Sequence, residues 1–250
     1  MFFSNNLKNI DHCFFSKLGG NSNKIYKSLN CGIGSNDNKR NIIKNLSNVS
    51  DYYGLSTKNL ITMHQTHSVK CKIIHNISKE PIHADGLVTN KSNLILSVLS
   101  ADCAPILLFD PGKKIIGACH AGWKGALNGI IENTLKTMQN LGSKKEDINC
   151  AIGPCINFTS YEVQSDLRDA FLKKSKKNKQ FFIKINKSKY IFSLSDFISN
   201  CLYDYGVKDV ENINIDTASN ESLCFSYRRS LNKKENDYGR MISTIVIKGN

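Results

Sequence analysis

Residues 94–125 read LILSVLSADCAPILLFDPGKKIIGACHAGWKG and contain three apolar segments with the character of strands. A buried strand is predicted at Leu94–Leu99, followed by extended segments at Pro105–Phe109 and Lys114–Cys119. Polar residues interrupt the apolar run, which falls short of the ~18 uninterrupted apolar residues that a membrane span requires. We therefore expect strands in the core of a soluble protein, with no membrane partner.

The clearest helix of the chain follows this segment. Apolar residues recur at helical spacing from Leu127 to Leu141, and Gly142 supplies a stop signal. We expect the turn Ala121–Gly125 to lead into it. Further helices are predicted at Asp37–Leu55 and from about Ser165 to Lys174.

Shorter strands and turns occupy much of the remaining chain. The glycines of residues 12–34 indicate turns between short strands. Other strands are predicted at Ile61–Met63, Val69–Ile74 and Met241–Ile247, and a strand that leads into a turn is predicted at Cys150–Cys155. Strands and helices without strict βαβ alternation indicate an α+β fold with helix-covered sheets. No repeat or linker divides the sequence, so we expect a single domain over residues 1–250, and a monomer.

The net charge of +13 could indicate binding to an anionic partner. Only five of the 34 basic residues are arginines, and the lysines are scattered, which is typical of a solvated surface. No nucleic-acid recognition motif accompanies them, so no nucleic-acid partner is expected. Arg228, Arg229 and Arg240 are a local concentration of a scarce residue that is suited to phosphate or carboxylate.

The nine cysteines do not predict a disulfide framework, because their number is odd, their spacing is irregular and no pair forms a C-x-x-C motif. The N-terminal residues show no signal peptide, so we expect a cytoplasmic protein with reduced thiols. A functional cysteine must therefore be identified by its neighbours.

Three potential metal ligands lie at the ends of predicted strands: His67, Cys103 and His120. A thiolate and two imidazoles bind zinc well and leave a fourth position for water or substrate. Spacing alone leaves other interpretations open. His64 is a rival ligand. Cys119 is a rival thiol, but it is less suited to act beside His120, because adjacent residues of a strand point to opposite faces. The three residues could also be buried groups with no metal.

Eight motifs occur in order along the chain, at Gln65–Ser68, Ala84–Thr89, Ala101–Pro105, His120–Gly125, Ala151–Ile156, Tyr161–Val163, Phe225–Arg229 and Gly239–Arg240. Together they closely resemble the laccase-domain (multicopper polyphenol oxidase) family, also described as a purine nucleoside phosphorylase and adenosine deaminase family. The resemblance extends from about Phe14 to the C-terminus.

The resemblance implies a four-layer α-β-β-α sandwich and a metal held by His67, Cys103 and His120. It implies zinc, with copper as the alternative. The implied reactions are phosphorolysis of adenosine, inosine, guanosine and methylthioadenosine, and deamination of adenosine. Copper-dependent polyphenol oxidation is an older description of the family, and some members resemble amidases that edit peptidoglycan precursors.

Three positions depart from the family pattern. Lys17 and Lys124 stand where arginine is usual, which keeps the charge but loses the bidentate fork. Asp216–Thr217 stands where many members have Cys-Thr, so either that cysteine is not needed for the core chemistry or this member is altered.

We expect His67, Cys103, His120 and Asp102 to be catalytic. In phosphorolysis, phosphate attacks C1′ of the ribose as the purine leaves, which requires a site for a dianion. The predicted phosphate ligands are Arg228, Arg229, Arg240 and Lys124, the last at a helix start. In deamination, Asp102 or Asp85 could move protons, although each could equally position a turn or a ligand.

Other functions remain open at this point. Cys103 could be the nucleophile of a metal-free hydrolase, with His120 as its base. Four coppers of a multicopper oxidase need more histidines than the six present. The signature of the known zinc deaminases is absent, because His83-Ala84-Asp85 has the wrong acid and Phe158 stands where a second cysteine should be.

Overall fold

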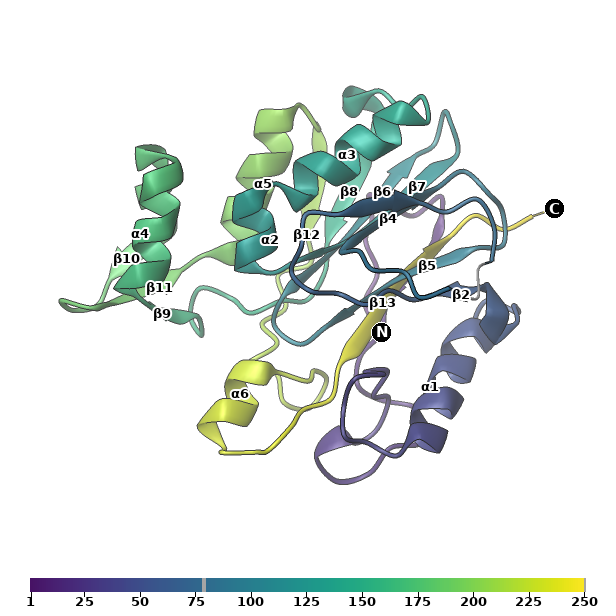
Figure 1. The fold of residues 1–250 in the computed structure, drawn as a ribbon, viewed down its shortest axis with the longest axis horizontal. Coiled ribbons are helices and arrows are strands. Elements are labelled where there is room, and N and C mark those ends of the chain that lie inside the picture. The colour runs from purple at the N-terminus through teal and green to yellow at the C-terminus, as the bar shows by residue number, and fades with distance from the viewer. Residues whose placement is uncertain (78–79, 250) are drawn as a thin grey trace.

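The computed structural model describes residues 1–77 and 80–249, which form four stacked layers (Figure 1). One helix covers a four-stranded sheet, this sheet packs on a six-stranded sheet, and a group of helices covers the second sheet. Three buried clusters fill the spaces between the layers. The predicted single-domain α+β sandwich with mixed sheets is confirmed.

The smaller sheet joins segments from both halves of the sequence. Its strand order is β1 (Asp11–Phe14), β13 (Met241–Val246), β5 (Ile95–Ser100) and β2 (Leu60–Ile61). The pairs are antiparallel except for β2 with β5. Helix α1 (Lys39–Asp51) buries Ile42 and Val49, as its helical spacing predicts, and Val49 packs in one cluster with Ile95 and Ile242 of this sheet.

The larger sheet carries the predicted strands of residues 94–125 at its centre. Its order is β12 (Asp209–Asn212), β8 (Asn149–Ile152), β6 (Ala104–Asp110), β7 (Ile115–Ala121), β4 (Gly86–Thr89) and β3 (Cys71–Ile73). The outermost pairs are parallel and the inner pairs antiparallel. Every residue of β6 and β7 is buried, because one face meets the smaller sheet and the other meets helices.

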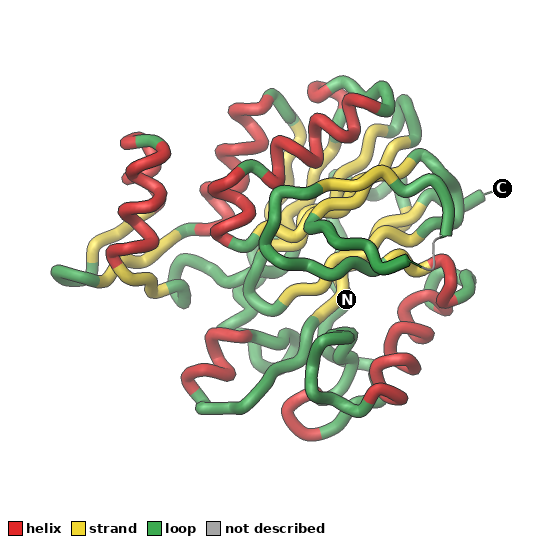
Figure 2. Tube along the Cα trace, in the orientation of Figure 1, coloured by secondary structure: helices red, strands yellow, loops and turns green. Residues whose placement is uncertain are grey.

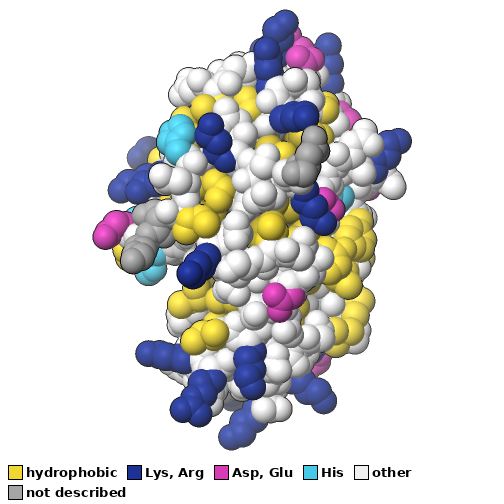
Figure 3. All heavy atoms as spheres, turned by 90° about the vertical axis from the view of Figure 1, so that its right-hand side faces the viewer, with side chains coloured by type: hydrophobic (Ala, Val, Ile, Leu, Met, Phe, Trp, Pro, Cys, Tyr) yellow, Lys and Arg dark blue, Asp and Glu magenta, His cyan; other side chains and the backbone are white. Residues whose placement is uncertain are grey.

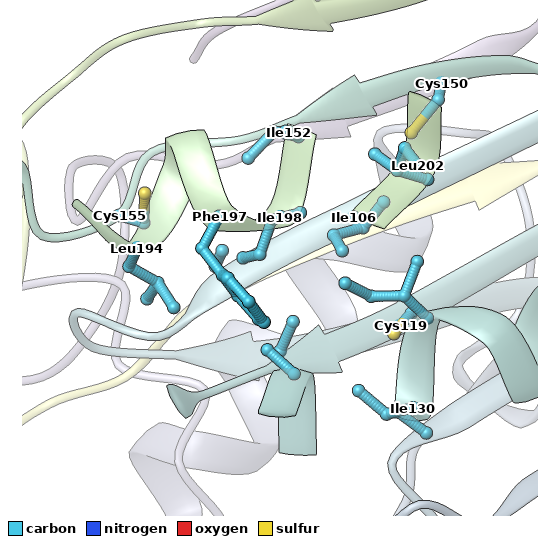
Figure 4. Packing of buried hydrophobic residues seen from close by; sticks show 14 of the residues in the cluster. Ile106, Cys119, Ile130, Cys150, Ile152, Cys155, Leu194, Phe197, Ile198 and Leu202 are labelled. Atoms are coloured by element: carbon cyan, nitrogen blue, oxygen red, sulfur yellow. The ribbon is translucent and has the colours of Figure 1, made fainter. Parts of the chain in front are cut away.

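The helices on the outer face of this sheet are α2 (Trp123–Asn128), α3 (Ile130–Asn140) and α5 (Leu194–Tyr205). Their apolar faces pack onto side chains of the central strands. Figure 4 shows Ile198 and Leu202 of α5, and Ile130 of α3, beside Ile106 and Cys119 of the sheet.

The prediction of one continuous helix after residue 125 is wrong, because the structure has two helices there. Gly129 adopts a left-handed conformation with φ of +104°, which ends α2 and starts α3 in a new direction. The residues Trp123–Gly125, predicted as a turn, form the first turn of α2.

A smaller lobe projects from one side of the sandwich, at the left of Figure 2. It contains β9 (Glu162–Gln164), α4 (Ser165–Lys174), β10 (Phe182–Lys184) and β11 (Lys189–Phe192), with the strands in the order β10-β11-β9. Helix α4 confirms the prediction for these residues. The remaining helices are α6 (Tyr227–Asn232) and four short 3-10 turns at Lys24–Tyr26, Thr57–Asn59, Lys145–Asp147 and Lys176–Phe181.

Within the described part of the chain, no helix combines the length and the apolar character that crossing a membrane would need. Lysine and arginine side chains are spread over the face drawn in Figure 3 and do not gather into one patch there. This distribution agrees with the interpretation of most lysines as solvated.

Candidate metal centre

The structure brings His67, Cys103 and His120 together. His67 lies in the loop between β2 and β3, Cys103 lies directly before β6, and His120 lies near the end of β7, paired with Pro105 of β6. Their potential ligand atoms all lie within 4.8 Å of one another. Cys103 Sγ is 3.6 Å from His67 Nε2. His120 is buried, Cys103 partly buried and His67 exposed, so the cluster opens to solvent on one side.

The buried carboxylate of Asp85, immediately before β4, organises two of these three residues. Its Oδ1 lies 2.9 Å from His120 Nδ1 and accepts from the backbone N–H of His67 at 3.1 Å. Its Oδ2 accepts from the backbone and hydroxyl of Ser68 at 2.7 and 2.6 Å. Asp85 therefore holds both the His67 turn and the His120 ring, which is the arrangement by which outer carboxylates orient metal-binding histidines.

The local charges follow from this arrangement. Burial disfavours the charged form of Asp85, but hydrogen bonds from His120 and Ser68 outweigh it and lower its pKa to about 2. Burial likewise opposes ionisation of Cys103, yet the neighbouring His120 and His67 lower its pKa to about 6. The pKa of His120 is raised to about 9 against the effect of burial, because Cys103 and Asp85 favour the imidazolium. In the metal-free protein, this arrangement favours the thiolate form of Cys103 and the imidazolium form of His120.

Asp102, next to Cys103, has a different environment. Its Oδ1 accepts from the Thr217 hydroxyl and its Oδ2 from the backbone N–H of Arg228, each at 2.6 Å. Its own carbonyl accepts from Ile156 N at 2.9 Å. Burial outweighs these bonds and raises the pKa of Asp102. These contacts join three loops behind Cys103, and the catalytic role predicted for Asp102 stays a prediction.

Both His67 and Asp102 adopt left-handed backbone conformations, with φ of 58° and 89°. Such angles are uncommon for residues other than glycine, and they cluster at functional sites where surrounding contacts hold them. Here the backbone of His67 is held by Asp85, and that of Asp102 by Ile156.

Gly122, between β7 and α2, leaves room for the cluster. A Cβ at this position would lie 2.6 Å from His67 Cδ2 and 2.8 Å from Cys103 Sγ. No side chain fits there without moving a ligand. The glycine of the His120–Gly125 motif is therefore required by the close approach of the backbone to the site.

The cluster lies in the wall of a cavity of about 870 Å³. Tyr227 and Tyr238 line it with Arg240, the one predicted phosphate ligand found in its wall. The Arg240 guanidinium lies 4.3 Å from the Tyr238 ring centroid and donates to the Tyr238 carbonyl at 3.2 Å. It is thus held beside the cavity with hydrogen-bond donors available for an anion.

The other predicted phosphate ligands lie elsewhere. Arg229 donates to the backbone carbonyls of Thr217, Ala218 and Cys224, so its guanidinium fixes a loop. Lys124 is exposed on α2, with Nζ 5.5 Å from the centroid of Trp123. Arg228 stacks over Tyr161 at 5.4 Å. The structure does not bring these side chains into the cavity wall with Arg240.

The rival ligands are not members of the cluster. Cys119 is buried on the opposite face of β7, in the core beneath the helices, as strand alternation predicts. His64 lines the cavity but contacts His83.

Two other residues of the ordered motifs and departures have structural roles. Trp123 packs against the same buried core as Cys119 and serves as an anchor of α2. Asp216 accepts from Ser160 Oγ at 2.5 Å and from two backbone N–H groups, which is a turn-forming role.

Sequence reasoning missed the role of Gln65. Its amide donates to the carbonyl of Leu99 and accepts from the N–H of the same residue, both at 2.8 Å. This pair of bonds ties the His67 loop to the end of β5. The signal was present, because Gln65 opens the first of the ordered motifs.

The cluster fits a transition-metal ion. A sulfur and two imidazole nitrogens are the donors that zinc and copper prefer. Ionised Asp85 can only accept, so His120 Nδ1 carries the proton and Nε2 is left to bind a metal. Among the described residues, this is the one group of three or more potential ligands that lies close enough together.

Fold and site together define a single-domain α+β protein with a His–Cys–His centre at the wall of an open cavity. Residues 11–248 match the family described as multi-copper polyphenol oxidoreductase laccase, and the chain belongs to this family.

Relatives of the chain match over nearly its whole length. A purine nucleoside phosphorylase of Rickettsia conorii is 39% identical over 94% of this chain and 95% of its own. The purine nucleoside phosphorylase YlmD of Bacillus subtilis is 30% identical over 97% and 90%. The crystal structure of the Bacillus licheniformis hypothetical protein YfiH superposes with a TM-score of 0.90 at 28% identity, covering 97% of this chain and 94% of the other.

Proposed function

We propose that this protein is a zinc-dependent purine nucleoside phosphorylase. The observation that carries the proposal is the His67–Cys103–His120 cluster in the wall of a cavity of about 870 Å³. A cavity of this size suits a nucleoside with a phosphate, since small-molecule sites span about 300–1,000 Å³. The names of the Rickettsia and Bacillus relatives support this activity.

The residues around the cavity match the two halves of such a substrate pair. Tyr227 and Tyr238 offer aromatic faces on which a purine can stack. Arg240 offers a planar, permanently charged group for the phosphate. Its position is restrained by Tyr238 and by Asp237 Oδ1 at 4.0 Å, so binding an anion requires little reordering of the side chain.

In the reaction, an oxygen of inorganic phosphate bonds to C1′ of the ribose as the C1′–N9 bond breaks and its electron pair leaves with the purine. Arg240 would orient the attacking phosphate and balance its charge. His67, Cys103 and His120 would hold the zinc, which supplies a Lewis acid for polarising an oxygen or nitrogen of the substrate. Asp85 keeps the His120 ring in the ligating tautomer.

Adenosine deaminase activity is a second part of the proposal. In this reaction water would add to C6 of adenine and ammonia would leave, and the open cavity gives water access. His67, Cys103 and His120 would hold the metal, which would supply a Lewis acid. The preferred nucleosides would include adenosine, inosine, guanosine and methylthioadenosine, in keeping with the sequence resemblance.

A specific observation favours a different candidate, a metal-free cysteine hydrolase. Cys103, with its pKa lowered to about 6, lies beside two imidazoles, as in enzymes with a thiolate nucleophile. Copper-dependent polyphenol oxidation is the third candidate and rests on the family description. Metal dependence separates the three.

The decisive experiment incubates the protein with adenosine, with and without phosphate, and identifies the products. Adenine that forms only with phosphate supports phosphorolysis, and inosine supports deamination. Zinc in stoichiometric amount, lost in His67→Ala together with activity, supports the metal-dependent reaction. Full activity without metal would favour the hydrolase, and stronger turnover of a phenol with copper would favour the oxidase.

We further propose a cytoplasmic monomer. All nine cysteines are free thiols, and eight of them have pKa values raised by burial, which suits a reducing compartment. Light scattering coupled to size exclusion tests the monomer, and fractionation of the source cells tests the location.

A further inference from the structure

A second pair of histidines lies beside the same cavity as the metal centre, because His64 lines its wall. His64 follows β2, and His83 precedes β4 and pairs with it in an isolated parallel bridge. The backbone N–H of His64 donates to the carbonyl of Ile82 at 2.7 Å, which fixes the two segments side by side. Both imidazoles are exposed.

The rings of this pair have a centroid distance and an interplanar angle close to those of the two rings of the metal centre. The centroids of His64 and His83 are 5.1 Å apart with an interplanar angle of 63°. Those of His67 and His120 are 4.9 Å apart at 72°. Two imidazoles that share one ion at about 2.0–2.1 Å, in a tetrahedral arrangement, place their centroids about 5 Å apart. The centroid spacing of the pair is therefore compatible with one ion held between the two rings.

We propose that His64 and His83 form a second binding site for a divalent transition-metal ion such as Zn²⁺ or Cu²⁺. Imidazole nitrogens suit these ions, and water would complete the coordination. The site is weaker than the first, because it offers two ligands and no thiolate, and its side chains are exposed. Since His64 lines the cavity, the second ion would lie in the same cavity wall as the first.

The test measures the number of Zn²⁺ ions bound per chain, by equilibrium dialysis of the zinc-loaded protein against increasing zinc. We expect two ions in the unmodified protein, one tight and one weaker. His64→Ala and His83→Ala should each lose the weaker ion and keep the tight one. His67→Ala should lose the tight ion and keep the weaker one. His75→Ala, which removes an exposed histidine outside the pair, should keep both.

His64→Phe separates metal binding from a purely structural ring contact. Phenylalanine keeps an aromatic ring against His83 but has no nitrogen, so the melting temperature should stay unchanged while the weaker ion is lost. One ion per chain at every zinc concentration would overturn the proposal. So would a second ion that persists in both His64→Ala and His83→Ala. These readouts use no nucleoside, so they do not depend on the proposed phosphorylase activity.

Discussion

Two buried carboxylates lie near the metal centre, Asp85 beside His120 and Asp102 next to Cys103 in the sequence, and they differ in what they hold. Asp85 accepts from His120 and from the turn that contains His67, and its pKa is lowered. Asp102 accepts from a hydroxyl and a backbone N–H of distant loops, and its pKa is raised. Burial raises the pKa of both carboxyls, but hydrogen bonds outweigh it at Asp85 and do not at Asp102. Asp85 faces a potential cation in His120, whereas the hydrogen-bond donors to Asp102 are neutral and Arg229 adds only the last of the effects that lower its pKa.

We expect the largest effect on zinc affinity from Asp85→Asn. The substitution keeps the size but places an amide N–H against N–H and O–H donors, so the orientation of His67 and His120 is lost. Zinc affinity should fall by about 10–100-fold, as for other outer carboxylates of zinc sites. Competition with a chromogenic chelator measures it.

Asp110→Asn is the matched control, because Asp110 is also buried but lies at the far end of β6. Its zinc affinity should equal that of the unmodified protein. Equal losses in the two variants would mean that Asp85 acts through general stability and not through the ligands.

The acid dependence of stability should have opposite signs for the two carboxylates. The pKa of Asp85 is lowered from 3.8 to about 2, so its contribution is complete above pH 3.8 and is lost as pH falls toward 2. This contribution is roughly 2 kcal/mol. The pKa of Asp102 is raised, so its ionisation opposes folding as pH rises through the shifted value.

Urea unfolding of the metal-free protein between pH 2 and 6 measures both contributions. Asp85→Asn should flatten the loss of unfolding free energy at the acid end, and Asp102→Asn should leave that acid limb in place. The same acid limb in Asp85→Asn as in the unmodified protein would contradict the assignment.

A smaller effect is expected for Asp102→Asn itself. The Asn side chain can still accept from the Arg228 N–H, and the Thr217 hydroxyl can turn to accept from the amide. Unfolding free energy should fall by about 1 kcal/mol or less, with zinc affinity retained. Calorimetry and the same chelator competition check both parts. Zinc loss comparable to that of Asp85→Asn would erase the distinction between the two carboxylates.

The smallest effect concerns the reactivity of Cys103 in metal-free protein. Alkylation by iodoacetamide should rise through about pH 6, ahead of the other cysteines, whose pKa values are raised. Asp85→Asn removes support for the imidazolium of His120, so the midpoint should move toward the ordinary value of 9.0. Asp102→Asn should leave it near 6. Mass spectrometry of the alkylated peptides gives both midpoints.

Much of the fold could be predicted from sequence, because apolar periodicity reports which face of an element is buried. The strands of residues 94–125 and the helix α1 follow directly from it. The break at Gly129 could not be predicted, because a glycine within a helical pattern is also compatible with a continuous helix. The order of strands in the two sheets depends on contacts between distant segments and has no local signal.

The site was predictable to a similar degree. Ordered motifs singled out His67, Cys103 and His120, and the structure brings them together. The roles of basic residues were harder to predict, because a guanidinium suits a phosphate and a backbone carbonyl equally well. Arg240 lines the cavity, whereas Arg229 donates hydrogen bonds to three backbone carbonyls. The difference comes from the paths of the loops that carry them.

The position of β13 between β1 and β5 has a consequence for how the chain folds. Thr244 of β13 donates to the carbonyl of Cys13, 231 residues earlier in the sequence. The smaller sheet therefore cannot close until β13, at Met241–Val246, has been synthesised, and contacts of such long range slow folding. Since Arg240 directly precedes β13, the part of the cavity wall that contains Arg240 should form in the same late step.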